Sequence, residues 1–398
     1  MTKRMTRAAV AATVLAIGLV VNTRPGSAHK PITSPYTFNE DVFPILRDRC
    51  GSCHVSGGIA PMSLMTHAEA VPWGESIRTE VLAGHMPPGT VDEAPARFRN
   101  APGLTLREMN LLLTWVTGGT PIGSPDKTPK PMAREAAWPL GPPDLALPLP
   151  AEAIIGADER ERTIEFVVPT GTTERRWVSA VDLLPGTAAM VRAATIAVRA
   201  PASSAASAVP ERVLARWLPG EPPIALDAGL GFELPASAEL VVRVLYRKTW
   251  EYERKELKDR SIVGLYFAPS GTASIQALRL APDAGAVASP ERYAFRRVVT
   301  DDVRAMAIYP EAGLNNASVQ VMATRPDKTR ADLIAFHPRP DWSRRYWFRE
   351  PIPLPRGTTI EVIVTFDDEA SLSPLSLPRA AGTPPDLSSV RLTLNVAP

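Results

Sequence analysis

Short runs of β-branched and aliphatic residues, separated by turn residues, fill the chain beyond about residue 160 and constrain its fold most strongly. They read RTIEFVVP, RRWVSAVDLLP, ATIAVRA, AELVVRVLY, SIVGLYFAP, ASVQVMAT, ADLIAFHP and TTIEVIVTF. Short strands in this number predict antiparallel β-sandwiches of a jelly-roll-like kind. The length of this part favours two all-β domains over one, and we expect them at residues 151–275 and 276–398.

Proline clusters just before these runs. The chain has 42 prolines, and many lie in the stretch TPIGSPDKTPKPMAREAAWPLGPPDLALPLP. So much proline removes amide donors and favours extended backbone. We therefore expect a semi-rigid linker over residues 125–150. An ordered loop that packs on the next domain through Trp138 is the alternative.

A Cys-x-x-Cys-His motif precedes the linker. Cys50 and Cys53 are the two cysteines of the chain, and His54 follows directly. In this pattern both thiols add to the vinyl groups of a haem, and the adjacent imidazole ligates the iron. A disulfide or a redox pair would leave the histidine unused, and zinc would need a fourth ligand, although each stays open. The motif predicts one covalent haem c.

Two capping boxes flank the motif, at Thr37 with Glu40 and at Thr105 with Glu108. The apolar residues after each box recur at helical spacing. In the first helix they are Phe38, Val42, Ile45 and Leu46, and in the second they are Leu106, Met109, Leu113 and Val116. Two helices around a haem motif predict a small all-α cytochrome c domain over residues 29–124.

The iron needs a sixth ligand on the opposite face of the haem. Met86, in the loop GHMPPGT, is the expected distal ligand, because a thioether favours ferrous iron and the following prolines stiffen the loop. Its competitors are Met62, Met65 and His85.

The N-terminus has the pattern of an export signal. Lys3, Arg4 and Arg7 precede an apolar run, and small residues follow at positions 26–28. We expect a cleaved signal peptide over residues 1–28 and a periplasmic or otherwise exported protein; an uncleaved membrane anchor is the alternative. Cleavage removes four basic residues and no acidic one, which moves the formal net charge from +2 to −2. This balance gives no indication of nucleic-acid binding, and we expect no integral membrane span in the mature protein.

Residues 36–123, from YTFNEDVFPILRDRCGSCHVSGG to LTLREMNLLLTWVTGGTPIG, resemble the cytochrome c domain of certain exported bacterial proteins. In those proteins the domain precedes a region similar to the copper type II, ascorbate-dependent monooxygenases. The resemblance implies haem c ligated by His54, with Met86 as the distal ligand. The family usually has tryptophan where this chain has Gly89.

The later part of the chain resembles the monooxygenase-like region in the order of its framework segments, but it lacks the copper ligands. The family's copper-binding histidines are replaced by Arg192 and Ala193, by Leu245, and by Glu311 and Gly313. Of the five histidines in the chain, His337 alone lies beyond residue 123. Because copper centres of this kind depend on several imidazoles, we do not expect copper.

These observations predict an exported monohaem c-type cytochrome that transfers electrons to or from an unidentified redox protein. Its β region would be a copper-free, monooxygenase-like scaffold. The alternative is a haem-coupled, copper monooxygenase-like oxidoreductase that acts on a small substrate. The shortage of histidine favours an electron carrier over an enzyme, and no catalytic residue is predicted.

Overall fold

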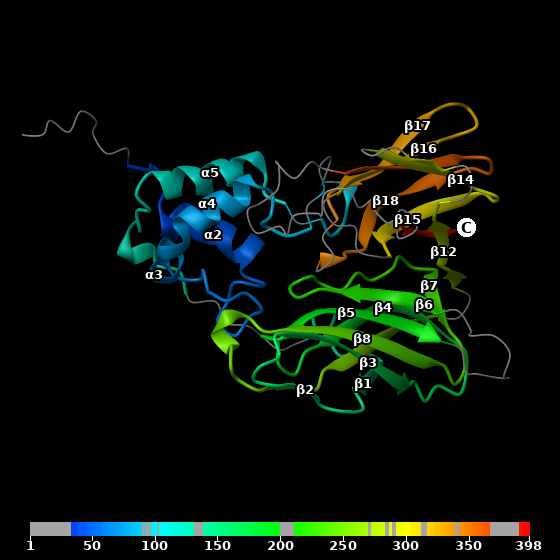
Figure 1. Cartoon of the computed structure of the whole chain (residues 1–398), viewed down its shortest axis with the longest axis horizontal. Coiled ribbons are helices and arrows are strands. Elements are labelled where there is room, and N and C mark those ends of the chain that lie inside the picture. Colours follow the sequence, from blue (N-terminus) through cyan, green and yellow to red (C-terminus); the bar gives the residue numbers. More distant parts are fainter. Residues whose placement is uncertain are drawn as a thin grey trace, which may run out of the picture.

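The structure is a computed structural model. It describes residues 33–89, 91, 97–101, 103–130, 138–199, 211–269, 272–282, 286–288, 292–311, 317–338, 342–366 and 390–398. The expected signal peptide, residues 1–28, lies outside the described residues, as do His29 and Gly313. Strands make up 41% of the structure and helices 16%. Figure 1 shows the helices gathered at one end of the molecule, beside the sheets.

The helical elements are short and share one small core. The first stretch winds as π-helix over Phe38–Val42, continues as α2 (Phe43–Ile45) and returns to π-helix over Leu46–Cys50. The others are α3 (His67–Ala70), a 3-10 turn (Val71–Trp73), α4 (Gly74–Leu82), α5 (Leu106–Thr117) and a 3-10 turn (Pro125–Lys127). Buried residues of the first stretch pack against Leu112 and Trp115 of α5.

The capping box of α5 is confirmed, and its predicted apolar face is confirmed in part, because Val116 packs against the helical core. Thr105 Oγ1 accepts a hydrogen bond from the Glu108 amide at 3.2 Å, and a Glu108 carboxylate oxygen accepts one from the Thr105 amide at 2.7 Å. Leu106 is 85% exposed, whereas Leu112 and Trp115 are buried. The large Trp115 ring decides which face of α5 meets the core.

The first helix shows the opposite result. Its predicted apolar face is confirmed, because Phe38, Val42, Ile45 and Leu46 are all buried. The expected capping box is wrong: the Thr37 amide donates to Asp41 Oδ2 at 2.8 Å, and Glu40 forms an ion pair with Lys127 instead.

Two sheets share the first β core, which contains Phe166, Val178, Leu183 and Val242. One has the order β1-β10-β4-β7-β11, and the other has the order β3-β8-β5-β6. The strands of the first sheet are β1 (Leu145–Pro148), β10 (Ile262–Ala268), β4 (Arg176–Leu184), β7 (Leu230–Leu234) and β11 (Ala273–Ser274). Those of the second sheet are β3 (Glu161–Pro169), β8 (Glu239–Arg247), β5 (Val191–Arg199) and β6 (Arg212–Trp217). A small antiparallel pair, β2 (Ala153–Ile155) with β9 (Leu257–Asp259), forms a separate two-stranded sheet, and a 3-10 turn spans Trp250–Tyr252.

Two further sheets share the second β core, which contains Phe295, Val321, Phe336 and Leu394. Their orders are β12-β20-β15-β18 and β13-β14-β19-β16-β17. The first comprises β12 (Gln276–Leu280), β20 (Leu392–Ala397), β15 (Val303–Pro310) and β18 (Tyr346–Leu354). The second comprises β13 (Val287–Ala288), β14 (Arg292–Val298), β19 (Thr359–Phe366), β16 (Ala317–Thr324) and β17 (Arg330–Phe336).

The strand predictions are confirmed at all the quoted runs, which correspond to β3, β4, β5, β8, β10, β16, β17 and β19. Alternation is clearest in β16, where every second residue from Ala317 to Ala323 is buried. The domain boundaries stay a prediction. Within the expected linker, residues 145–148 pair with β10 as strand β1, and the Tyr266 hydroxyl donates to the Gly141 carbonyl at 2.7 Å.

The segment between α4 and α5 leaves the helices and enters the β region. Val91 and Phe98 belong to the second β core. Phe98 forms a β-bridge with Phe348, and the Arg99 amide donates to the Trp347 carbonyl at 2.8 Å. The helices are therefore held against the sheets by the chain that connects them.

The expected fold class, an all-α cytochrome c domain followed by two all-β sandwich domains, is therefore wrong. The chain is predominantly β, built from small sheets, and the longest helix of the described residues, α5, has 12 residues. Pro44 and Pro72 start new short turns within the helical stretches because proline lacks an amide donor. Residues 91 and 98 complete a β core, so the described part of residues 29–124 does not form an all-α cytochrome domain.

Candidate functional site

Cys50, Cys53 and His54 lie on one turn at the end of the first helical stretch. The amides of Cys53 and His54 both donate to the Cys50 carbonyl, at 3.1 and 2.8 Å. Gly58 holds the next turn close, because a Cβ there would lie 2.3 Å from the Cys53 carbonyl oxygen. The backbone thus places Cys50, Cys53 and His54 on one turn, and their role in holding a haem stays a prediction.

His54 has a defined tautomer. Its Nδ1 lies 3.2 Å from the Met62 carbonyl oxygen, which can only accept, so Nδ1 carries the proton. Burial lowers the pKa of this imidazole, which keeps it neutral near pH 7. A neutral ring protonated at Nδ1 has its lone pair on Nε2, the atom that would bind a metal.

Cys50 and Cys53 form no disulfide, and both are half-buried. Burial, followed by the neighbouring Cys53, raises the pKa of the Cys50 thiol to about 12. A redox-active Cys-x-x-Cys pair needs a thiol with a lowered pKa, because the thiolate is the nucleophile. The thioredoxin-like alternative is therefore disfavoured. Within the described residues, no group of three or more His, Cys, Asp or Glu side chains could hold a metal ion, which also disfavours a zinc site of that kind.

The candidates for the distal ligand lie in different surroundings. Met65 is 3% exposed within the helical core, and the carbonyl of Met62 faces the Nδ1 edge of His54, away from Nε2. His85 Nδ1 lies 3.0 Å from Glu80 Oε2. Met86 is half-buried in the loop after α4, where its amide donates to the Glu80 carbonyl at 3.2 Å. None of the described contacts joins Met86 to His54, so its role as distal ligand stays a prediction.

A loop of the β region contacts the motif, and no sequence pattern predicts this contact. We call residues 218–224 the bridge loop. The Cys53 thiol donates to the Pro219 carbonyl at 3.6 Å, and a Cβ on Gly220 would lie 2.4 Å from Ser52 Cβ. Because 166 residues separate Cys53 from Pro219, spacing along the chain could not reveal this contact.

The positions at which the resembled family has copper-binding histidines make other interactions in this chain. The Arg192 guanidinium lies 4.7 Å from the Trp342 ring, and Ala193 pairs with Leu245 between β5 and β8. The Glu311 carboxylate accepts hydrogen bonds from Arg279, at 3.1 Å, and from a threonine hydroxyl. His337, just after β17, is exposed.

No helix in the described ranges is long and apolar enough to cross a membrane. The partner of the protein is not identified by these contacts.

No protein-family model and no curated protein matches the chain. Among solved structures, a peptide-N(4)-(N-acetyl-β-D-glucosaminyl)asparagine amidase is similar with 9% identity and a TM-score of 0.25, over 63% of this chain and 96% of that one. A putative α-L-fucosidase from Bacteroides ovatus has 10% identity and a TM-score of 0.18. That match covers 54% of this chain and spans about a third, 34%, of the fucosidase. Similarities this weak carry no argument about fold or function.

The resemblance to exported cytochrome c proteins with a monooxygenase-like region is therefore wrong as a family assignment. No family model supports it, and the predominantly β structure lacks the all-α cytochrome domain among its described residues. The descriptions of the chain as having a cytochrome c fold, a cluster of metal-ligating side chains and a monooxygenase-like region are therefore also wrong. Within the described residues, no group of three or more metal-ligating side chains supports such labels.

Proposed function

We propose that the chain carries one covalent haem c on Cys50 and Cys53, with His54 as the axial ligand, and that it is an exported electron-transfer protein. The observation that carries the proposal is the state of His54 on the same turn as Cys50 and Cys53, which form no disulfide. The His54 Nδ1–H donates a hydrogen bond to the Met62 carbonyl, which leaves the lone pair of Nε2 available to bind iron. This donor set fits a haem c, which needs two thiols and one imidazole on a single turn.

The chain's own residues orient and shield the site. The Met62 carbonyl fixes the rotation of the imidazole, and the buried side chains of Val55 and Leu64 lie in the core that Cys50 packs against. When bound, the haem would supply a one-electron iron couple. A thioether from Met86 would complete the ligands. The sheets would act as a copper-free scaffold, and the electron-transfer partner would be another redox protein.

The test is covalent attachment in a host that can mature c-type haem. We expect the haem of the wild-type protein to stay with the polypeptide in acidified acetone. Replacing Cys50 and Cys53 by alanine should release it, whereas Ser52→Ala, between them, should not. Wild-type haem that extracts freely, or a matured preparation without haem, would contradict the proposal.

The axial ligand has its own control. His54→Ala should change the Soret spectrum. His67→Ala should leave it unchanged, because His67 Nε2 is bonded to the Thr120 carbonyl at 2.8 Å and its ring packs on Phe38 and Trp115. N-terminal sequencing of the exported protein would test cleavage after residue 28.

A further inference from the structure

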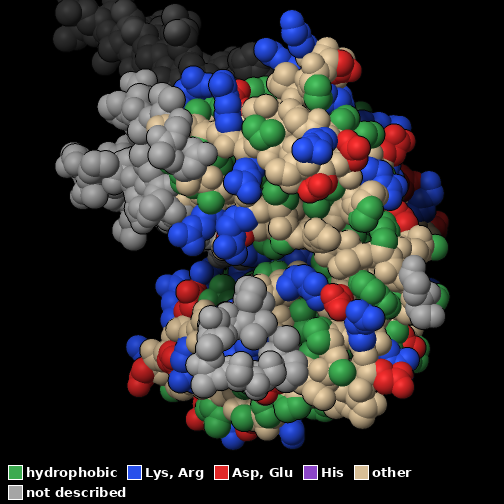
Figure 2. All heavy atoms as spheres, turned by 90° about the vertical axis from the view of Figure 1, so that its right-hand side faces the viewer, with side chains coloured by type: hydrophobic (Ala, Val, Ile, Leu, Met, Phe, Trp, Pro, Cys, Tyr) green, Lys and Arg blue, Asp and Glu red, His purple; other side chains and the backbone are tan. Residues whose placement is uncertain are grey.

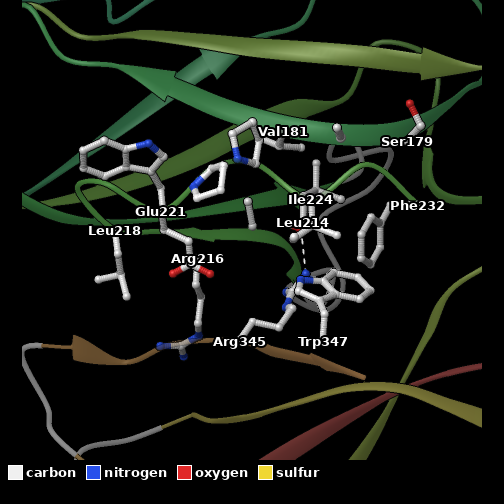
Figure 3. A pocket seen from close by; sticks show the side chains of 15 residues that line it. Ser179, Val181, Leu214, Arg216, Leu218, Glu221, Ile224, Phe232, Arg345 and Trp347 are labelled. Atoms are coloured by element: carbon white, nitrogen blue, oxygen red, sulfur yellow. Dashed lines mark hydrogen bonds between the residues drawn. The ribbon is translucent and has the colours of Figure 1, made fainter. Parts of the chain in front are cut away.

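A cavity of about 50 Å³ lies where the first pair of sheets meets the start of β18. Strands β4, β6 and β7 and the bridge loop form most of its wall, and Arg345 and Trp347 close it from the second pair. Figure 3 shows Arg216 extending from the first pair of sheets toward the second, while Arg345 extends in the opposite direction toward Leu214. On the face drawn in Figure 2, Lys and Arg side chains gather at the hollow between the upper and lower halves of the molecule.

Arg345 is a buried cation whose hydrogen bonds, within the described residues, go to backbone carbonyls. It is 3% exposed, and its two terminal nitrogens donate to the carbonyls of Leu214 and Val213 at 2.7 and 2.9 Å. Its guanidinium lies 4.7 Å from the Tyr309 ring and 5.6 Å from the Trp347 ring. Its Nε has no hydrogen-bond partner among the described residues.

Arg216 is held in the same way. It donates to the Ser343 hydroxyl and, at 3.2 Å, to the backbone carbonyl of Glu311, and it lies 4.9 Å from the Tyr309 ring. Its Nε also lacks a partner within the described residues. Burial lowers the pKa of Arg216 to about 10, so it is still protonated at neutral pH. In the described part of the chain, neither Arg216 nor Arg345 forms an ion pair.

Glu221 is the carboxylate in the cavity wall, and it is already engaged. Its carboxylate lies 3.3 Å from Arg344 and accepts a hydrogen bond from the Asn100 amide. The side chains of Arg344 and Glu221 are only 8% and 11% exposed. The guanidiniums of Arg216, Arg344 and Arg345 therefore lie around a cavity whose wall contains this one carboxylate. The charge of Glu311 also acts on Arg216, but that carboxylate is already paired with Arg279, so burial of the remaining positive charge is costly without a further anion.

We propose that this cavity binds a small oxyanion, a carboxylate or an inorganic oxyanion, between Arg216 and Arg345. Guanidinium groups recognise the oxygens of such anions through several N–H donors, and each of these arginines has its Nε–H unused. One water molecule needs a cavity volume of about 10–15 Å³. The cavity of about 50 Å³ therefore has room for only a few water molecules. It therefore fits an anion of the size of acetate, sulfate or phosphate and excludes a nucleotide or a sugar chain.

The test uses the full chain and sodium acetate, sodium sulfate and inorganic phosphate as probes, at an ionic strength held constant with sodium chloride. Trp217 and Trp347 line the cavity, so intrinsic fluorescence reports on occupancy. We expect at least one probe to give a saturable fluorescence change and a rise in Tm beyond those in chloride. Arg216→Gln should weaken its apparent Kd by about tenfold or more, because a charged hydrogen-bond donor is lost.

Two further variants complete the test. Arg199→Gln removes one positive charge at a different place, where Arg199 of β5 forms a partly exposed ion pair with Glu239 of β8. This variant should leave the Kd within about twofold of the wild-type value. Glu221→Gln, which removes the competing carboxylate, should tighten binding, and it gives an answer even if Arg216→Gln does not fold. No saturable effect beyond chloride, or a Kd that is the same in wild type, Arg216→Gln and Glu221→Gln, overturns the proposal.

Discussion

Replacing the buried carboxylate of Asp182 by an amide should stabilise the protein at neutral pH. Asp182 lies in β4 with 4% exposure, and its Oδ1 accepts hydrogen bonds from the Leu183 amide at 2.8 Å and from Trp217 Nε1 at 3.1 Å. Burial raises the pKa of this carboxyl from 3.8 to about 6, although both hydrogen bonds oppose the rise. Asp182→Asn keeps an oxygen for both donors and removes the buried charge.

The sign and size of the effect follow from this pKa. Between pH 4 and 6 the unfolded chain releases the Asp182 proton while the folded chain keeps it, so the free energy of unfolding falls as pH rises. The full loss is about 3 kcal/mol, at about 1.4 kcal/mol per pH unit between the two pKa values. Asp182→Asn should therefore match the wild type at pH 3 and exceed its stability by up to about 3 kcal/mol at pH 7.

The assay is urea unfolding of both proteins from pH 3 to 8, followed by tryptophan fluorescence, with the difference in free energy plotted against pH. Asp259→Asn is the matched control. Its carboxylate accepts four hydrogen bonds, from Tyr246, Thr187 and the amide and hydroxyl of Ser261, so an amide there loses acceptors and should destabilise at pH 7. A difference for Asp182→Asn that stays flat with pH, or that favours the wild type at pH 7, would refute the reasoning.

Three other outcomes are expected. Met86→Ala should abolish the weak far-red sulfur-to-iron band of the oxidised haem protein and lower its reduction potential; an unchanged spectrum would redirect attention to His85. Phe98→Ala should cost about 3–5 kcal/mol in urea unfolding, because Phe98 is 3% exposed between the Tyr346 and Phe348 rings, and a loss below about 1 kcal/mol would contradict its place in the core. Gly220→Ala should speed the reaction of the haem-free thiols with a thiol reagent, since the residue has a φ of 76° and faces Ser52; equal rates in wild type and variant would show that the bridge loop does not cover the motif.

The strands and the ends of α5 were predictable because local patterns determine them. Alternating apolar residues mark β16, and the Thr105–Glu108 box marks the start of α5. The buried face of α5 was not predictable, because it depends on how Trp115 fits a core formed by other segments. The fold class failed for a similar reason: nothing local shows that Phe98, between two helices, completes a β core.

The candidate site divides in the same way. The turn that joins Cys50, Cys53 and His54 follows from their spacing, and the Met62 carbonyl that fixes the imidazole lies only eight residues on. The arginine-lined cavity had no sequence signature. Arg216 and Arg345 are 129 positions apart along the chain and meet only because β6 and β18 face each other, so their shared chemistry is a property of the tertiary structure.

The bridge loop contacts the Cys-x-x-Cys-His motif and also forms part of the cavity wall. Pro219 contacts Cys53, and Gly220 lies against Ser52. Leu218 and residues 221–224 form part of the cavity wall. Proline occupies positions 219, 222 and 223, and each ring fixes one backbone dihedral. Because these dihedrals have little freedom, an anion that altered the path of the loop at the cavity would also alter the contacts around Cys53. The two proposed sites would then be coupled through a few residues of main chain.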